Sequence, residues 1–302
     1  MSDFLRGNMS IQWYPGHMTS AKKKAEEAME FNDLVIEVLD ARIPGSSTNP
    51  MIQSLRQARQ RPHLKILNKA DLADPEITAQ WLVYFNQQPK TLALALSAKN
   101  IRDVKKILVA CQKLAPHRGT PVKPLRMLIM GVPNVGKSTI INALKNKRIA
   151  KVGNEPAVTK MQQRIELNDH MILTDTPGMM WPKITNELDG IFLAASHTIG
   201  INAYDELETA LALYDTLKEA YPETLAQHYK ITLPFPKDEQ FLSHLAATRK
   251  FILRKGELDL HKAAVTFLND YRQGIIGRIS LESPLSRIAM LQKINENLPL
   301  TE

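Results

Sequence analysis

The chain contains 302 residues, of which 44% are hydrophobic and 23% are charged. This length is enough for about two domains with real cores, and the ordinary composition excludes a wholly disordered protein. No apolar run approaches the ~18 residues that a membrane span needs, the first residues lack the apolar core of a secretion signal, and the single cysteine cannot form an intramolecular disulfide. We therefore expect a cytoplasmic protein.

The net charge of +8 is unevenly distributed along the chain. Residues 1–180 carry 26 Lys or Arg and 15 Asp or Glu, whereas residues 181–302 carry 13 and 16. A basic first half is compatible with a polyanionic partner such as a nucleotide, RNA or acidic lipid. Surface lysines on an ordinary soluble protein would produce the same balance, so charge alone does not decide between these interpretations.

The first half alternates short apolar segments with polar, helix-like segments, which is typical of a parallel sheet covered by helices. Residues 113–124 contain three prolines and a glycine and predict a linker between two helix–strand units. The polar, alternating segment 162–167 indicates an edge or antiparallel strand. Apolar strands are predicted at residues 34–40, 64–68, 92–96, 126–130 and 170–174.

The pattern becomes helical after residue 181. The capping-box spacing of Asp205 and Glu208 predicts a helix that stops before Pro222. Apolar residues between 260 and 271 recur at helical spacing, and Gly274 is placed to end that helix. We expect an α/β domain over residues 1–185 and a small all-α C-terminal domain over residues 186–302.

A phosphate-binding loop is predicted at residues 131–139, GVPNVGKST, which match GxxxxGK[ST] between a predicted strand and a predicted helix. The glycines let backbone amides turn toward phosphates, Lys137 would neutralise the β- and γ-phosphates, and the Ser138 hydroxyl would bind Mg²⁺. A plain glycine turn is the alternative. The predicted phosphate-binding residues are Asn134, Val135, Gly136, Lys137, Ser138 and Thr139.

Guanine selection is predicted from NKAD at residues 68–71 and SAK at residues 97–99. The Asp71 carboxylate can accept guanine N1–H and the N2 amine, which adenine lacks. The Lys69 stem can lie over the base and Asn68 can fix the neighbouring loops, while the SAK segment offers a backbone N–H to guanine O6. The predicted guanine-binding residues are Asn68, Lys69, Ala70, Asp71, Ser97 and Ala98.

DTPG at residues 175–178 follows another predicted strand. Asp175 would hold Mg²⁺ through water, and the Gly178 amide would meet the γ-phosphate. Thr159 is the candidate second Mg²⁺ hydroxyl, and a loop threonine without that role is the alternative. Because ligands bind at the carboxyl ends of parallel strands, we expect all these motifs to share one crevice.

The order of the motifs is unusual, since NKAD and SAK precede the phosphate loop and DTPG follows it. Ordinary GTPases have the phosphate loop first and the guanine motifs last. Circular permutation keeps the contacts of a fold and moves only the chain ends. The expected fold is therefore a circularly permuted P-loop GTPase domain, with a mostly parallel sheet between helices.

With these motifs in place, the chain resembles the ribosome biogenesis GTPase A family of permuted GTPases. The resemblance extends to IQWYPGHM (11–18), DARIP (40–44), NP (49–50) and WPK (181–183), and Ala157 departs from the glycine usual before the loop threonine. It implies a GTP-dependent factor in late maturation of the large (50S) ribosomal subunit, whose slow hydrolysis is stimulated by the particle. It also implies partners among rRNA and ribosomal proteins, and a C-terminal helical domain that contacts RNA.

The residue that orients the attacking water is not evident from DTPG. Met179 stands where many small GTPases carry a glutamine, and a methionine cannot hold a water molecule in this way. Lys137 is one candidate catalytic residue, and the resemblance marks His17 as another. A histidine that caps a helix or contacts RNA is the alternative for His17. Asn134 matches the asparagine that lets related GTPases bind K⁺, which would supply positive charge to the transition state.

Two other functions stay open: a GTPase of another process, such as tRNA modification or membrane-associated signalling, and a GTP-binding module with negligible hydrolysis. Because the chain leaves the GTPase domain directly after DTPG, we expect loss of the γ-phosphate to reorient the helical domain. Basic residues of the tail are candidates for an RNA-facing stripe, with ordinary surface charge as the alternative: Arg249, Lys250, Arg254, Lys255, Arg272, Arg278 and Arg287.

Overall fold

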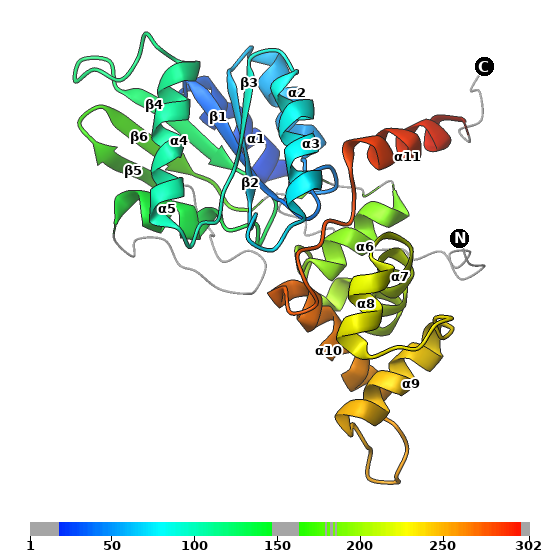
Figure 1. Cartoon of the computed structure of the whole chain (residues 1–302). Coiled ribbons are helices and arrows are strands. Elements are labelled where there is room, and N and C mark those ends of the chain that lie inside the picture. Colours follow the sequence, from blue (N-terminus) through cyan, green and yellow to red (C-terminus); the bar gives the residue numbers. More distant parts are fainter. Residues whose placement is uncertain (1–17, 147–162, 179, 182–183, 185, 297–302) are drawn as a thin grey trace. The chain divides into compact units, whose positions relative to one another are not determined.

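The structure, a computed structural model, describes residues 18–146, 163–178, 180–181, 184 and 186–296. These residues form two compact units (Figure 1). The sheet unit contains the described residues up to 181 together with 282–296, and the helical unit contains those between 182 and 281. None of the described helices is long and apolar enough to cross a membrane.

The sheet unit is built on six strands in the order β3-β2-β1-β4-β6-β5. All neighbours are parallel except β5 and β6, which are antiparallel. The five apolar strands and the polar edge strand predicted from sequence are therefore confirmed. Their bounds are β1 (Leu34–Asp40), β2 (His63–Asn68), β3 (Thr91–Ala95), β4 (Leu125–Met130), β5 (Gln163–Asn168) and β6 (Met171–Asp175).

Helices follow the strands of this unit because polar caps and prolines start them. Asn49, Asp74 and Asn100 each accept a hydrogen bond from the first helical turn, and Pro50 and Pro75 occupy helix starts where no donor is needed. The described helices are α1 (Met18–Glu30), α2 (Pro50–Ala58), α3 (Pro75–Asn86), α4 (Ile101–Leu114), α5 (Lys137–Lys145) and α11 (Pro284–Glu296).

Helices cover both faces of the sheet. Val35 and Leu39 of β1 lie on one face, Val35 packing with residues of α1 and α2 and Leu39 with residues of α3. Figure 1 shows α4 in front of the sheet and α1 behind it. Every residue of β1 is buried, which explains why its sequence is apolar except for Glu37 and Asp40. The predicted linker begins later than expected, since α4 continues to Leu114 before Pro116.

The helical unit confirms the predicted helix ends. Asp205 accepts a hydrogen bond from the Glu208 amide, and Gly274 adopts a positive φ of 73° at the end of its helix. Tyr214 and Phe267 pack around Phe241 in the core. The helices are α6 (Glu187–Ala195), the 3-10 turn η2 (Ile201–Ala203), α7 (Glu206–Ala220), α8 (Pro222–Tyr229), α9 (Asp238–Arg249) and α10 (Leu260–Gln273).

The C-terminal helix α11 differs from the expected domain division, because it belongs to the sheet unit. Glu282, just before it, is buried and accepts hydrogen bonds from the Ser46 amide at 2.6 Å and the Ser46 hydroxyl at 3.1 Å. Trp81 of α3 donates its indole N–H to the Glu282 carbonyl at 2.9 Å. These contacts attach residues from 282 onward to the sheet unit.

Two arginines of the expected RNA-facing stripe have structural partners. Arg272 donates to the carbonyls of Ala194 and Ala195 inside the helical unit. Arg287 lies in the sheet unit, where its guanidinium is 3.6 Å from a Glu282 carboxylate oxygen. Both side chains therefore contribute to the fold, and the RNA-facing stripe stays a prediction.

Candidate functional site

The carboxyl ends of five parallel strands lie at one edge of the sheet. NKAD begins with the last residue of β2, SAK follows β3, the phosphate loop follows β4 and DTPG begins with the last residue of β6. The topology therefore brings together the motifs that are separated in the sequence.

Asn68 joins three of these loops. Its Nδ2 donates to the carbonyl of Val135 at 2.7 Å, and its Oδ1 accepts from the Ala98 amide at 2.9 Å. The side chain is buried, so both hydrogen bonds are shielded from water. Asn68 thus has the loop-fixing role predicted for it. The Ala98 amide, a candidate donor for guanine O6, here donates to Asn68.

The phosphate loop depends on backbone conformations that favour glycine. Gly131 and Gly136 have φ values of 147° and 99°, and a Cβ on Gly136 would lie 2.2 Å from the Asn68 amide nitrogen. Helix α5 starts at Lys137, and no side chain caps it. The first amides of α5 are therefore available to an anion at its N-terminus.

Lys137 is buried beneath this loop. Its Nζ donates to the carbonyls of Gly131 at 3.0 Å and Val132 at 3.1 Å. Burial lowers its pKa to about 8, while the charge of Asp175 acts in the opposite direction. The Lys137 ammonium is therefore shielded from water, and it would attract an anionic ligand strongly.

Asp175 is a buried carboxylate at the end of β6. Neither of its oxygens finds a hydrogen-bonding partner within the described part of the chain. Burial raises its pKa to about 6, against the effect of the Lys137 charge. A buried carboxylate that has no hydrogen-bond donor among the described residues fits a Mg²⁺ ion, which prefers oxygen ligands, and Ser138 in the first turn of α5 offers a hydroxyl as a second candidate ligand.

DTPG lies directly against the phosphate loop. A Cβ on Gly178 would be 3.1 Å from Pro133 Cα and 3.2 Å from Pro133 N. Thr176 donates its hydroxyl to the Ile129 carbonyl at 2.9 Å and so ties the segment to β4. His17, Thr159 and Met179 lie outside the described residues.

The candidate base-binding end is formed by NKAD and SAK. The Asp71 carboxylate is 3.3 Å from Lys99 Nζ. Burial would raise the pKa of Asp71, but a hydrogen bond from the Ser97 side chain and the charge of Lys99 outweigh it and lower the pKa. The carboxylate is therefore ionised, as an acceptor for two guanine N–H groups must be.

Asp40 and Arg42 belong to this end of the site, and the sequence did not reveal them as functional. Lys69 has a positive φ of 63° and donates its ammonium to Asp40 Oδ2 at 2.7 Å. Arg42 pairs with the same carboxylate at 2.8 Å. The DARIP segment was visible in the sequence, but nothing in its spacing indicated contact with Lys69.

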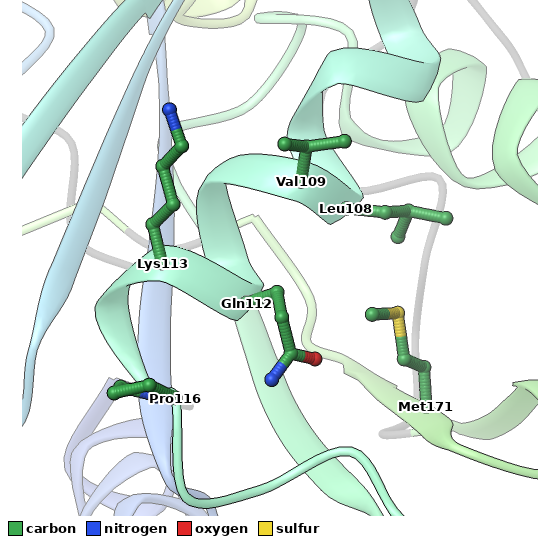
Figure 2. Close-up of a pocket in the computed structure, with 6 residues that line it drawn as sticks. All are labelled: Leu108, Val109, Gln112, Lys113, Pro116 and Met171. Carbon is green, nitrogen blue, oxygen red and sulfur yellow. The ribbon is translucent and has the colours of Figure 1, made fainter.

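A separate apolar hollow of about 460 Å³ lies on α4 and the start of β6 (Figure 2). Met171 begins β6 whereas Asp175 ends it, so the hollow is at the opposite edge of the sheet from the candidate site. Figure 2 shows Leu108, Gln112 and Met171 pointing toward one another. No predicted site residue lines this hollow.

Comparisons with known sequences agree with the site. A family described as 50S ribosome-binding GTPase matches residues 126–231. Ribosome biogenesis GTPase A of Bacillus cereus is 36% identical over 284 residues, which cover 91% of this chain and 95% of that protein. The Priestia megaterium protein of the same name is 37% identical and covers 91% and 98%. Mitochondrial ribosome-associated GTPase 1 of Mus musculus is 33% identical and covers 92% of both chains.

Solved structures agree as well. The GNP-bound crystal structure of YlqF from T. maritima matches with a TM-score of 0.63 and 26% identity, covering 88% of this chain and 99% of that chain. The GDP-bound form gives a TM-score of 0.64 and 25% identity, covering 87% and 99%. The expected fold class, a permuted P-loop GTPase with a helical C-terminal region, is confirmed. With relatives up to 37% identical over nearly their whole length, this chain belongs to the ribosome biogenesis GTPase A family.

Proposed function

We propose that this protein hydrolyses GTP to GDP and phosphate and acts as an assembly factor in late maturation of the large ribosomal subunit. The Asn68 side chain carries the nucleotide part of the proposal, since it connects the phosphate loop to the SAK loop through Val135 and Ala98. The names of the relatives support the ribosomal part.

The phosphates would bind at the start of α5 and the base at NKAD and SAK. Lys137, buried beside the loop carbonyls, would exchange part of its loop contacts for the β- and γ-phosphate oxygens. Asp71 would accept guanine N1–H and the N2 amine. The proposed GTP-binding residues are Asn68, Lys69, Ala70, Asp71, Ser97, Ala98, Asn134, Val135, Gly136, Lys137, Ser138, Thr139 and Gly178.

Ser138 and Asp175 would hold Mg²⁺, with Thr159 proposed as a second hydroxyl. When bound, the ion supplies positive charge to the β- and γ-phosphate oxygens. Asp175 suits this place because it is buried and has no donor from the described residues.

During hydrolysis a water oxygen would bond to the γ-phosphorus while the bond from that phosphorus to the β–γ bridging oxygen breaks. GDP leaves with the electron pair of the broken bond, and both hydrogens of the water leave with the phosphate as H₂PO₄⁻. Lys137 would stabilise the negative charge that develops on the bridging oxygen. His17 is proposed to orient the water, since Met179 cannot.

Potassium is proposed as a further source of positive charge in the transition state. Asn134 lies within the phosphate loop, where it adopts a positive φ of 56°. If K⁺ binds there, phosphate release should be faster in KCl than in NaCl at equal ionic strength. Equal rates in both salts would remove the potassium proposal and leave the GTPase proposal intact.

A stimulated hydrolysis assay tests the catalytic proposal. Phosphate release is measured with and without large ribosomal subunits for the natural protein and for His17→Ala. His170→Ala is the matched control, because His170 is an exposed residue of the turn between β5 and β6. We expect stimulation by the particle that His17→Ala abolishes and His170→Ala keeps. Phosphate release that large subunits do not stimulate, or tighter binding of ATP than of GTP, would contradict the proposal.

Co-sedimentation tests the partner. In the cytoplasm, rRNA and ribosomal proteins of the large-subunit precursor are the proposed partners, and the helical unit is the proposed contact. We expect the protein to sediment with large subunits in a non-hydrolysable GTP analogue and to release them in GDP, because loss of the γ-phosphate changes DTPG. Equal binding in both nucleotides would contradict the switch, and no binding would favour another process.

A further inference from the structure

Asp40 is a buried carboxylate that gathers three donor groups at the end of β1. Its Oδ1 accepts from the Arg42 amide at 3.1 Å and from Arg42 Nε at 2.9 Å. Its Oδ2 accepts from Arg42 NH2 at 2.8 Å and from Lys69 Nζ at 2.7 Å. One anion thus holds two cations, and Lys69 is the cation that belongs to NKAD.

Asp40 is a permanent anion, and Arg42 fixes its position. Burial alone would raise the pKa of Asp40, but the charges of Arg42 and Lys69 outweigh it and hold the pKa well below its usual range. Arg42 is itself only 1% exposed and grips both carboxylate oxygens. The two-point grip leaves the carboxylate one orientation in which to receive Lys69.

Without Asp40, Lys69 would have another carboxylate within reach. Asp71 is two residues away and its charge already acts on the Lys69 ammonium. Asp71 is also exposed, and its side-chain partners in the described part of the chain are Ser97 and Lys99. An ammonium that paired with Asp71 would occupy the oxygens that the proposed function assigns to guanine N1–H and the N2 amine.

We infer that Asp40, oriented by Arg42, is a specificity-determining positioning residue: it draws the Lys69 ammonium away from Asp71 and leaves that carboxylate to guanine. The inference rests on the proposed guanine-binding role of Asp71. Asp40 acts through Lys69 and does not itself touch the base.

The test compares GDP with IDP, whose hypoxanthine base lacks the N2 amine that Asp71 would accept. The natural protein should bind GDP at least about tenfold more tightly than IDP, as a hydrogen bond to a charged acceptor predicts. Asp40→Asn should weaken GDP binding and bring the ratio of the two dissociation constants close to one. Asp33→Asn is the matched control, because it removes a carboxylate that pairs with Arg118 at the other end of β1. It should leave the ratio unchanged.

A double variant separates positioning from a general loss of structure. Asp40→Asn/Lys69→Met removes the released ammonium, and it should restore a ratio of about tenfold or more even if overall affinity stays low. If Asp40→Asn does not fold, Lys69→Met is the second variant. It removes the ammonium and leaves Asp40 paired with Arg42, so the affinity for both nucleotides should fall while the ratio of their dissociation constants stays near that of the natural protein. The inference would be overturned if the ratio of the two dissociation constants stayed unchanged in Asp40→Asn, or if it fell to about one in Lys69→Met. A natural protein that does not distinguish GDP from IDP would instead contradict the guanine site itself.

Discussion

At the scale of single residues, the site combines two buried charges of opposite sign that act on each other and have few hydrogen-bonding partners among the described residues. Lys137 contacts only loop carbonyls among the partners described above, and Asp175 finds no donor in the described regions. Their pKa values shift toward neutrality, to about 8 and about 6. Such charges destabilise the nucleotide-free protein and are stabilised by a ligand of complementary charge, here phosphate and Mg²⁺.

Asp175 should make stability fall as pH rises. Its pKa of about 6 in the folded protein exceeds the usual 3.8, so the folded state binds more protons than the unfolded state between these values. Asp175→Asn should therefore raise the free energy of unfolding by up to about 3 kcal/mol at pH 7.5 and by almost nothing near pH 3.5. Urea unfolding without nucleotide at both pH values measures this difference.

The control for that experiment is Asp169→Asn, an exposed carboxylate in the turn of the same β5–β6 hairpin. It should change stability by no more than about 0.5 kcal/mol at either pH. A stabilisation by Asp175→Asn that is equal at both pH values would show that its buried charge is not the cause.

Asp71→Asn should change the preferred base. An amide cannot accept both guanine N–H groups, but its NH₂ can donate to the C2 carbonyl of xanthine. We expect GDP to bind about 10- to 100-fold more weakly and XDP to bind more tightly than to the natural protein. Competition binding measures both, with Asp103→Asn on α4 as the control. Unaltered preference in Asp71→Asn would contradict the assignment of the base site.

At the scale of elements, the turn from β4 to α5 is the most constrained part of the site. Gly136 caps α5 in a left-handed conformation, and its missing side chain makes room for Asn68. The same turn therefore presents helix amides to phosphate and accepts the residue that connects it to the base-binding loops.

Gly136→Ala and Gly256→Ala form a matched pair at this scale. Both glycines have positive φ values, 99° and 82°, so either alanine should cost about 1 kcal/mol in backbone strain. Only at position 136 would the new Cβ meet a side chain, whereas nothing lies within 4 Å at position 256. We expect Gly136→Ala alone to weaken GDP binding, by about tenfold or more. Equal affinities in a titration of both variants would contradict the role of the Asn68 contact.

At the scale of the whole molecule, the helical unit is inserted into the sheet unit. The chain leaves the sheet unit after residue 181, close in sequence to DTPG, and returns to it at Glu282. Glu282 holds the returning chain through Ser46, while Ser47, the next residue, accepts from the Asp40 amide at 3.2 Å. Both connections thus join the sheet unit near segments of the candidate site.

Glu282→Ala should release α11 from the sheet unit. It removes a buried carboxylate and leaves the Ser46 amide without its acceptor, so we expect a loss of about 2–4 kcal/mol in unfolding free energy. Hydrogen exchange should become faster in residues 284–296 and 44–47. Glu223→Ala, at an exposed position of α8, is the control and should change neither. Unchanged exchange in Glu282→Ala would contradict the role of the Glu282 carboxylate in holding α11.

Sequence reasoning predicted the strands because a strand that is buried on both faces is mostly apolar, as β1 is apart from Glu37 and Asp40. It also predicted the phosphate loop and the guanine-binding motif NKAD, since each needs particular residue types at fixed local spacing. The contacts of Asn68 with the neighbouring loops were predicted from the NKAD motif. The nucleotide and Mg²⁺ contacts of the site residues stay predictions, as do the roles of His17, Thr159 and Asn134.

The sequence by itself therefore determined the strand pattern, the permuted motif order and the nucleotide class, all of which depend on residues near one another in the chain. Only the tertiary structure decided that Asp40 and Arg42 hold Lys69, and that Glu282 returns α11 to the sheet unit. The physical reason is that a buried charge takes its partner from whichever segment the fold brings within about 3 Å, and sequence spacing does not encode that choice.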